Sequence, residues 1–542
     1  MTLSDAAPAR KTPLRVGLIS LGCAKNLVDA EIMLGSLLKS GLEITNDPRQ
    51  ADVLIVNTCS FIQSAQEESI QAILESSQIR SQANPTQALI VSGCLPQRFR
   101  DQLPKLLPEV DAFMGIDQVA GVGEIVQQAL ARRRLKLGSA SVPVASVGVS
   151  PAGPPNEGGS LNCGPLINVD RRPHYIPDFA APRFRLTPRH FAYVKIAEGC
   201  NHPCSFCIIP QMRGSHRSRP QDDIVREARQ LIAAGVKELN LISQDSTYYG
   251  LDLQPAHTRA ISSPRKFAAA AQSLPAGAAT LATLLRQLND LPGRFWVRLL
   301  YTHPAHWTDQ LIAAISECPK VARYVDIPLQ HIHDNMLERM RRETSRQYII
   351  DLLAKIRDRI PGIALRTTFI VGFPGETDEY FDCLLDFIRA TRFERLGVFT
   401  YSRQDGTRAA KMEGQIPDAL KRRRQNRAMA EQLKIARQIS ASRLGHQATV
   451  LVERPANGRE LQSAQVSSWE HGLIRSARAS SRIPPRQGAR YWLARGEADA
   501  PDIDGRVYVR GRVSAGDFAR VKIVGHTDYD LIAEPVIAPT AS

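Results

Sequence analysis

Short apolar runs alternate with amphipathic helical patterns over the first 130 residues. β-branched apolar strands joined by helices are typical of a parallel sheet that is covered on both faces. Residues 14–130 are therefore predicted to form a parallel α/β domain. Its strands are expected at Arg15–Gly22, Asp52–Asn57 and Ala88–Ser92, and its helices at Leu27–Leu38 and Ala65–Ser76.

Each of these three strands runs directly into a cysteine, namely Cys23, Cys59 and Cys94. The carboxyl ends of parallel strands share one edge of the sheet, where open α/β folds bind their ligands. Three thiols that are far apart in sequence are thus expected to converge on one crevice. Burial as ordinary apolar cysteines is the alternative, since free cysteine is commonly buried.

The same alternation resumes between residues 191 and 401. Six strands with crossover helices indicate a partial or complete parallel βα barrel. Strands are predicted at Ala192–Ile196, Glu238–Ile242, Trp296–Leu300, Arg323–Ile327, Leu365–Val371 and Gly397–Tyr401, and helices at Ile224–Ala234, Thr283–Leu291 and Tyr380–Ala390. An Ala-, Pro- and Ser-rich stretch, Gln254–Thr280, interrupts this pattern and is predicted to be a surface insertion.

The segments that flank the barrel differ in composition. Residues 131–185 are rich in Ser, Gly and Pro, contain Cys163, and are predicted to be a low-complexity linker. A basic helix is expected over Asp418–Leu444, and its Lys421–Arg424 run is either a solvated face or an RNA contact. After it, β-rich runs predict a separate antiparallel module over residues 434–538, with an insertion at Ser463–Arg490. The runs are Ala448–Val452, Arg506–Val509 and Phe518–Val524.

Composition narrows the class of protein. The 542 residues are 43% hydrophobic and 23% charged, which excludes a wholly disordered chain. No apolar run approaches the ~18 residues of a membrane span, and the N-terminus lacks the apolar region of a secretory signal, so a cytoplasmic protein is expected. The net charge of +15 points to an anionic partner such as RNA or the ribosome. Nine cysteines in such a compartment favour metal ligands over disulfides.

The strongest chemical signal is a Cys-x3-Cys-x2-Cys triplet of Cys200, Cys204 and Cys207. Three thiolates on a short loop can hold three irons of a [4Fe–4S] cluster and leave the fourth iron open for a substrate. A zinc site needs a fourth ligand, and His202 lies awkwardly inside the loop. Three unrelated structural cysteines are the remaining alternative. Cys318, Cys383 and Cys163 have no ligand spacing and are interpreted as bystanders.

This triplet, with Phe206 before its last cysteine on a βα barrel, resembles the radical S-adenosylmethionine superfamily. The resemblance implies that the open iron binds S-adenosylmethionine, and that one electron cleaves the bound molecule to a 5′-deoxyadenosyl radical. It also implies contacts to S-adenosylmethionine from Phe206, from Gln244 or Asp245 in LISQDS, and from Gly372 and Gly375 in FIVGFPGET. The alternatives are a hydrogen-bonded barrel rim and an ordinary strand-to-helix turn.

The three-part architecture is similar to that of methylthiotransferases, with a radical core at residues 186–431 and a TRAM-like tail. In that family the three N-terminal cysteines hold a second [4Fe–4S] cluster that delivers sulfur, which here implies Cys23, Cys59 and Cys94. Two S-adenosylmethionine molecules are then used per turnover, one as methyl donor and one as radical source. An electron donor and a sulfur donor are implied as partners. The tail is expected to recruit the substrate as a module outside the chemistry.

Four stretches resemble the RimO type of this family: SLGCAKNLVDAE, CSFCIIPQMRG, DIPLQHI and ADAPDIDG. The resemblance implies methylthiolation of the β-carbon of an aspartate in the twelfth ribosomal protein of the small subunit. Asp499, Asp502 and Asp504 are candidate contacts to that basic protein, or else belong to a polar loop. Methylthiolation of a tRNA adenosine is the competing activity. A basic iron–sulfur protein that binds RNA or the ribosome without catalysis is the alternative of another class.

Overall fold

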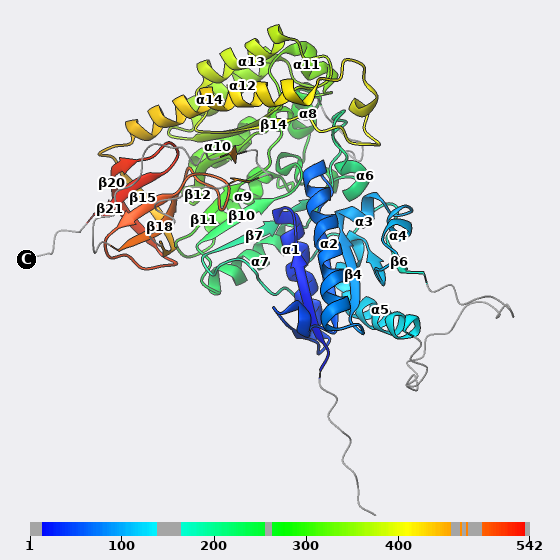
Figure 1. Cartoon of the computed structure of the whole chain (residues 1–542). Coiled ribbons are helices and arrows are strands. Elements are labelled where there is room, and N and C mark those ends of the chain that lie inside the picture. The colour runs from blue at the N-terminus through cyan, green and yellow to red at the C-terminus, as the bar shows by residue number, and fades with distance from the viewer. Residues whose placement is uncertain are drawn as a thin grey trace, which may run out of the picture. The chain divides into compact units, whose positions relative to one another are not determined.

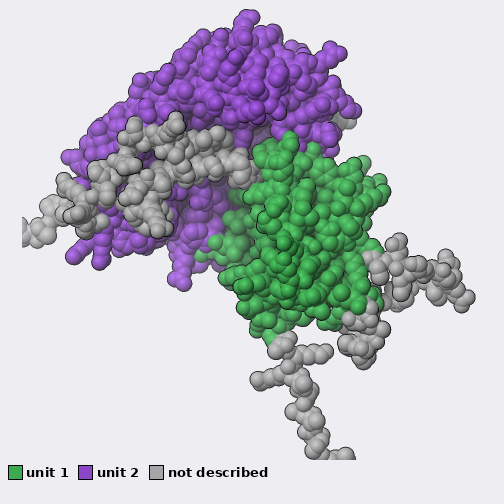
Figure 2. Space-filling model, viewed as in Figure 1, with its two compact units in different colours: residues 1–175, 180–186 green, residues 176–179, 187–542 purple. Residues whose placement is uncertain are grey.

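The computed structural model describes residues 13–137, 164–254, 263–456 and 490–536, and a strand pair at Ser467–Ser468 and Leu473–Ile474. The chain forms two compact units (Figure 2). Unit 1 consists of Met1–Tyr175 and Ala180–Leu186, and unit 2 of Ile176–Phe179 and Thr187–Ser542. In the described part, no helix is long and apolar enough to cross a membrane.

Unit 1 contains a six-stranded sheet of order β2-β1-β3-β4-β5-β6 in which every pairing is parallel. The predicted parallel α/β domain is thereby confirmed, because strands β3 and β4 are buried on both faces. The strands are β1 (Arg15–Ser20), β2 (Glu43–Ile44), β3 (Val53–Thr58), β4 (Ala88–Gly93), β5 (Ala112–Met114) and β6 (Leu166–Asn168), and the helices are α1 (Ala24–Lys39), α2 (Gln63–Ala83), α3 (Cys94–Arg98), α4 (Leu103–Leu106) and α5 (Val122–Lys136).

The predicted linker at 131–185 is partly wrong, because its ends are packed structure. Helix α5 continues to Lys136, and β6 pairs with β5. Arg183 then forms a 2.5 Å ion pair with the buried carboxylate of Glu31 on α1. Composition alone hides such contacts, because a few long side chains fix a Pro-rich segment. Cys163 lies outside the described residues.

Unit 2 contains six parallel strands in the order β14-β13-β12-β11-β10-β7. This is the partial barrel among the two predicted forms (Figure 1). The strands are β7 (Phe191–Lys195), β10 (Glu238–Ile242), β11 (Trp296–Leu299), β12 (Val321–Asp326), β13 (Ala364–Val371) and β14 (Arg395–Thr400). A short pair, β8 (Ala197–Glu198) and β9 (Arg217–Ser218), follows β7.

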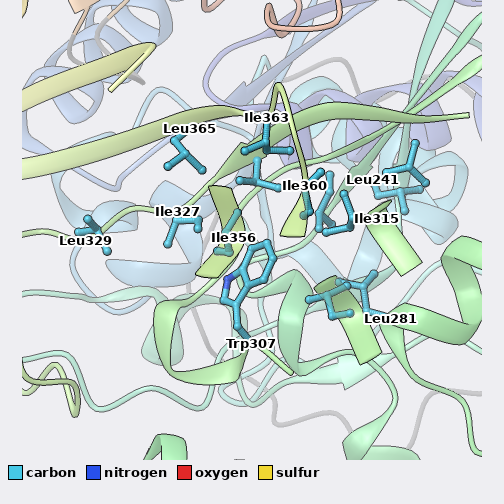
Figure 3. Packing of buried hydrophobic residues seen from close by; sticks show 14 of the residues in the cluster. Leu241, Leu281, Trp307, Ile315, Ile327, Leu329, Ile356, Ile360, Ile363 and Leu365 are labelled. Atoms are coloured by element: carbon cyan, nitrogen blue, oxygen red, sulfur yellow. The ribbon is translucent and has the colours of Figure 1, made fainter. Parts of the chain in front are cut away.

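Helices cover the outer face of this sheet and bury its main apolar core. Figure 3 shows side chains of this core from both layers, with Leu241 and Leu365 from the strands and Leu281, Ile315 and Ile356 from the helices. Burial of each such aliphatic side chain stabilises the folded state by roughly 1.5–3 kcal/mol relative to leaving it exposed. The helices are α6 (Ile209–Arg213), α7 (Gln221–Ala233), α8 (Pro264–Gln272), α9 (Leu281–Asp290), α10 (Asp309–Glu317), α11 (Asp334–Arg339), α12 (Arg346–Arg359), α13 (Asp378–Thr391) and α14 (Asp418–Ser442).

The stretch predicted as a surface insertion, Gln254–Thr280, contributes to the packed structure instead. Its helix α8 buries Phe267 and Ala270. The ring of Phe267 stacks on His306 with centroids 4.3 Å apart. The Ala-rich composition concealed this amphipathic face, so that part of the prediction was wrong.

The tail forms a closed five-stranded barrel of order β15-β18-β19-β21-β20. Every pairing is antiparallel except that of β19 with β21. Its strands are β15 (Gln447–Pro455), β18 (Tyr491–Gly496), β19 (Val507–Arg510), β20 (Phe518–His526) and β21 (Leu531–Pro535). This barrel belongs to the same compact unit as the six-stranded sheet, so the expected separate module is not a separate body. Apart from the two short strands, the predicted insertion up to Ala489 lies outside the described residues.

The basic run at the start of α14 is only half solvated. Lys421 and Arg424 are buried, whereas Arg422 and Arg423 are exposed. Arg424 forms a 2.7 Å ion pair with the buried carboxylate of Glu376. The helical period therefore splits the run into a structural face and a solvent face.

A network of arginines and carboxylates joins the tail to the six-stranded sheet. Glu238 on β10 accepts from Arg298 on β11 and from Arg495 on β18, each at 2.5 Å. Arg298 also donates to the carbonyl oxygens of Gly496 and Glu497. Two of the predicted substrate contacts already have partners within this network. Asp499 pairs with Arg395, and Asp504 binds Tyr324 and Arg366.

These pairings correct the interpretation of ADAPDIDG as an acidic docking loop. Asp499 and Asp504 are only 3% and 6% exposed, so a partner protein cannot reach them. Asp502 alone of the three is exposed. It lines a cavity of about 510 Å³ at this junction, together with Arg189, Arg454 and Arg506.

Candidate functional site

The first cysteine triplet lies at one edge of the unit 1 sheet. Cys23 precedes the first residue of α1, Cys59 follows β3, and Cys94 opens α3 directly after β4. Because β1, β3 and β4 are adjacent and parallel, the three strand ends meet there.

Asn26 and Gly22 fix the loops of this triplet against one another. Asn26 donates to the carbonyl oxygens of Leu21 and Thr58, and its Oδ1 lies 3.6 Å from the Sγ of Cys94. Gly22 has φ +92°, and a Cβ there would lie 2.8 Å from the Cβ of Cys59. The structure thus brings the cysteine-bearing turns together as the sequence predicts.

The second triplet occupies a loop between β8 and α6 in unit 2. The backbone N–H of Ser205 donates to the carbonyl oxygen of Met340, and its hydroxyl donates to that of Arg339. The turn after α11 thereby anchors the loop. Burial raises the pKa of Cys207 to about 12, with repulsion from Cys204 adding to the effect. Burial likewise raises the pKa of Cys200. As free thiols these two groups are neutral at pH 7, so a bound metal must displace their protons.

The spacing of the ligand atoms distinguishes a cluster from a single ion. In the described residues, the one set of three ligand atoms within 4.8 Å of one another consists of His202, His303 and His306, not of cysteines. A tetrahedral zinc ion would draw its sulfur ligands to within about 4 Å of one another. Neither cysteine triplet is that compact, and thiolates are the preferred ligands of iron–sulfur clusters.

The three histidines form a buried cluster that includes His202 of the cysteine loop, and two of them bind Asp245. His202 and His306 lie 2.8 and 2.7 Å from one carboxylate oxygen of Asp245. The rings of His202 and His303 stack face to face at 3.6 Å, which does not direct both ring planes at one ion. Burial lowers the pKa of His202 to about 4, so this imidazole is neutral. His202 thus supports the loop rather than serving as a fourth ligand, and Asp245 belongs to the hydrogen-bonded rim.

The sequence interpretation missed two features next to the loop: the pair His303 and His306, and Arg342, whose Nη1 lies 3.7 Å from the Sγ of Cys204. His303 and His306 follow β11 in the stretch YTHPAHW, and Arg342 lies in MRRE after α11. A pair of histidines just beyond a barrel strand was the available signal, since such positions line the ligand-binding edge. For Arg342 the sequence carries no signal, because it is one of many arginines.

Gln244 has the clearest mark of a binding residue among the predicted contacts to S-adenosylmethionine. Its Nε2 donates to Glu198 at 2.6 Å, and Glu198 is held by Lys195 and Arg213. The Oε1 of Gln244 is buried and has no hydrogen-bond partner. A buried acceptor without a donor is costly unless a ligand supplies the donor. The ammonium group of S-adenosylmethionine is such a donor.

The predicted contacts Phe206, Gly372 and Gly375 are placed differently. Phe206 packs in a small cluster with Met336, Met340 and Phe373 beside the cysteine loop. Gly372 has φ +70°, and a Cβ there would lie 2.2 Å from the Cγ of Lys421. The close approach that requires this glycine is therefore to helix α14, and its contact with S-adenosylmethionine stays a prediction. Gly375 has φ +81° and is similarly close to the guanidinium of Arg339.

The two described bystander cysteines lie in the apolar core. Cys318 is buried in the main cluster of unit 2, and Cys383 packs against that cluster. Burial raises the pKa of each thiol. Neither is near a second cysteine in sequence, and both behave as small hydrophobic residues.

Comparison with known families assigns the class first. Residues 194–388 match the Radical SAM superfamily, residues 15–115 match the Uncharacterized protein family UPF0004, and residues 485–536 match the TRAM domain. The chain is therefore a radical S-adenosylmethionine enzyme. The superfamily match and the partial barrel with its three-cysteine loop both support this class. Such enzymes use a [4Fe–4S] cluster and S-adenosylmethionine.

Relatives of nearly equal length give the particular family. A protein of Opitutus terrae named "Ribosomal protein uS12 methylthiotransferase RimO" is 51% identical, covering 96% of this chain and 97% of its own. One of the same name from Akkermansia muciniphila is 46% identical over 96% and 100%. The chain belongs to the RimO family of radical S-adenosylmethionine methylthiotransferases. A solved structure, the methyltransferase TsrM from Kitasatospora setae, aligns with a TM-score of 0.45 and 16% identity, covering 73% of this chain and 77% of that one.

Replacing Gln244 with Leu is expected to weaken the binding of S-adenosylmethionine about tenfold or more, because the buried acceptor is lost. Gln244→Glu keeps an acceptor but places a second carboxylate against Glu198, so it should recover only part of the wild-type affinity. Equilibrium dialysis of labelled S-adenosylmethionine against the iron-loaded protein measures both. Unchanged binding by the Leu variant would show that Oε1 faces something other than the ligand.

Proposed function

We propose that this chain methylthiolates the β-carbon of an aspartate in ribosomal protein uS12. The carrying observation is an open three-cysteine loop on a partial barrel, in a chain whose full-length relatives bear that activity in their names. We place the reaction in the cytoplasm with the ribosomal substrate. An electron donor and a sulfur donor complete the set of partners. An unactivated C–H bond resists acid–base chemistry, so a radical is required.

We propose two [4Fe–4S] clusters with separate ligand sets. Cys23, Cys59 and Cys94 would hold one cluster in unit 1. Cys200, Cys204 and Cys207 would hold the other in unit 2. When bound, these groups supply sulfur transfer and reductive cleavage of S-adenosylmethionine, respectively. The donor sets support this assignment, since thiolates are the preferred ligands of iron–sulfur clusters.

The side chains around the loop have binding and orienting roles in this proposal. The orphaned Oε1 of Gln244 accepts from the ammonium group of S-adenosylmethionine. Phe206 and its apolar neighbours exclude water from one side of the loop. The stack of His202, His303 and Asp245 holds the loop rigid, because each of the three is buried and in contact with another. Rigid orientation of the reacting groups is the protein's main contribution to such chemistry.

The tail contributes to substrate recruitment through its exposed surface. Asp502 is the remaining acidic candidate for contact with basic uS12, since it alone of the three aspartates is exposed. Arg422 and Arg423 on α14 are exposed cations available to ribosomal RNA. Apart from Leu186, which belongs to unit 1, the proposed radical core at 186–431 and tail at 434–538 fall within unit 2.

The substrate is tested by offering both candidates to the reconstituted enzyme. Purified uS12 and unmodified tRNA are incubated separately with S-adenosylmethionine, sulfide and a reductant under anaerobic conditions. Mass spectrometry is expected to find one methylthio group on uS12 and none on tRNA. Modification of the tRNA alone would replace this proposal with the adenosine methylthiotransferase activity.

Iron content tests the two ligand sets. The reconstituted chain is expected to bind about eight irons, and about four after Cys200, Cys204 and Cys207 are all replaced with Ala, because each triplet holds one four-iron cluster. Replacing Cys23, Cys59 and Cys94 instead should also leave about four. An intact chain that binds only about four irons would contradict the assignment.

A further inference from the structure

Arg342 is a buried cation beside the cysteine loop that has no carboxylate partner among the described residues. Its residue exposure is 6%. Nη2 donates to the carbonyl oxygen of Pro328 at 2.7 Å, Nη1 points at the Sγ of Cys204 at 3.7 Å, and Nε is buried without a hydrogen-bond partner. The buried Arg298 and Arg395, in contrast, each bind a carboxylate.

A buried charge without an opposite charge is strongly disfavoured. The surroundings of Arg342 therefore favour the binding of an anion. The sulfur that Nη1 faces belongs to Cys204, one of the three proposed cluster ligands. A cluster with three thiolate ligands carries net negative charge and would complete the site.

Backbone hydrogen bonds hold the turn that carries Arg342, and the bond to Pro328 holds its guanidinium. The N–H of Arg342 donates to the carbonyl oxygen of Leu337, and the N–H of Thr344 donates to that of Arg342. The same turn is tied to the cysteine loop through Ser205. The separation of cation and sulfur is thus set by the fold rather than by a flexible surface side chain.

We propose that Arg342 is a positioning residue that raises the reduction potential of the cluster held by Cys200, Cys204 and Cys207. The one-electron-reduced cluster carries one more negative charge than the oxidised cluster. A cation near a ligand sulfur therefore stabilises the reduced form more. Arg342 would thus favour the electron uptake that must precede cleavage of S-adenosylmethionine. This inference rests on the proposed cluster at the loop.

The experiment measures potential rather than turnover. In a background with Cys23, Cys59 and Cys94 replaced by Ala, the reconstituted protein is titrated with reductant and followed by electron paramagnetic resonance. Arg342→Gln is expected to lower the equilibrium constant for one-electron reduction about tenfold, which is about 59 mV for one electron. Arg342→Lys should retain most of the wild-type value. The matched control is Arg341→Gln, because Arg341 is the exposed neighbour and should leave the potential unchanged.

The other outcomes are equally decisive. An unchanged potential in Arg342→Gln, or an equal fall in Arg342→Gln and Arg342→Lys, would overturn the proposal. Iron content separates assembly from tuning. If Gln loses the iron and Lys keeps it, the need for the positive charge is supported. If both lose it, Arg342 has a structural role only and the proposal fails. If the unsubstituted loop binds no iron, the failure belongs to the proposed function instead.

Discussion

Replacing Glu238 with Leu is expected to lower the free energy of unfolding of unit 2 by about 3–5 kcal/mol. The change removes the carboxylate that Arg298 and Arg495 share, and leaves buried positive charge without its partner. It also weakens the junction between the six-stranded sheet and the tail barrel. Chemical denaturation followed by circular dichroism measures the loss. A variant as stable as the wild type would show that the junction contributes little.

A matched control and an acid titration test the physical cause. Glu317→Ala removes an exposed partner of Arg286 and should change stability by no more than about 1 kcal/mol. Burial would raise the pKa of Glu238, but the charges of Arg495 and Arg298 outweigh burial and lower it. Its stabilisation is therefore present above the ordinary glutamate pKa of 4.5 and is lost as the pH falls below it. Glu238→Leu should flatten that part of the acid dependence.

Replacing Cys59 with Ala is expected to abolish methylthiolation while leaving cleavage of S-adenosylmethionine measurable. Cys204→Ala should abolish both, because the loop that binds the cleaved molecule loses a ligand. Chromatography of 5′-deoxyadenosine and mass spectrometry of uS12 measure the two steps separately. The absence of 5′-deoxyadenosine even in the wild type would favour a non-catalytic iron–sulfur protein.

Cys383→Ala serves as the control for these two variants. This cysteine packs against the core of unit 2 and has no proposed ligand role. The substitution should leave both products at wild-type levels. If Cys59→Ala still forms methylthiolated uS12 at the normal rate, the division of labour between the two triplets is wrong.

The period of apolar residues predicted the parallel strands of both sheets. The position of each cysteine directly after a strand also predicted that the three cysteine-bearing turns come together at one edge of the unit 1 sheet. These features are local, since strand direction and side-chain alternation follow from neighbouring residues. The cysteine loop was equally recognisable in the sequence, because its three cysteines lie within eight residues.

Pairings between distant residues could not be predicted in this way. Asp499 and Asp504 resemble a polar loop in sequence, and only the fold places Arg395 and Arg366 against them. The Lys421–Arg424 run conceals one buried and one exposed face. Arg342 becomes distinctive only in the fold, because it is buried and forms no ion pair with a carboxylate among the described residues. The partners and the burial of a charged residue therefore cannot be predicted from the sequence around it, but the structure shows both directly.

The arginine and carboxylate junction has a consequence for synthesis of the chain on the ribosome. Arg298 donates to Glu497, which lies 199 residues later. At about 5–20 residues per second, that partner emerges roughly 10–40 s after the arginine. Asp504 and Asp499, the partners of Arg366 and Arg395, are likewise synthesised long after these arginines. The arginines of these core strands therefore lack their tail partners until the tail emerges from the ribosome. A nascent chain arrested before residue 495 should be digested by protease much faster than the released protein, and chaperones have their longest opportunity to bind during that interval.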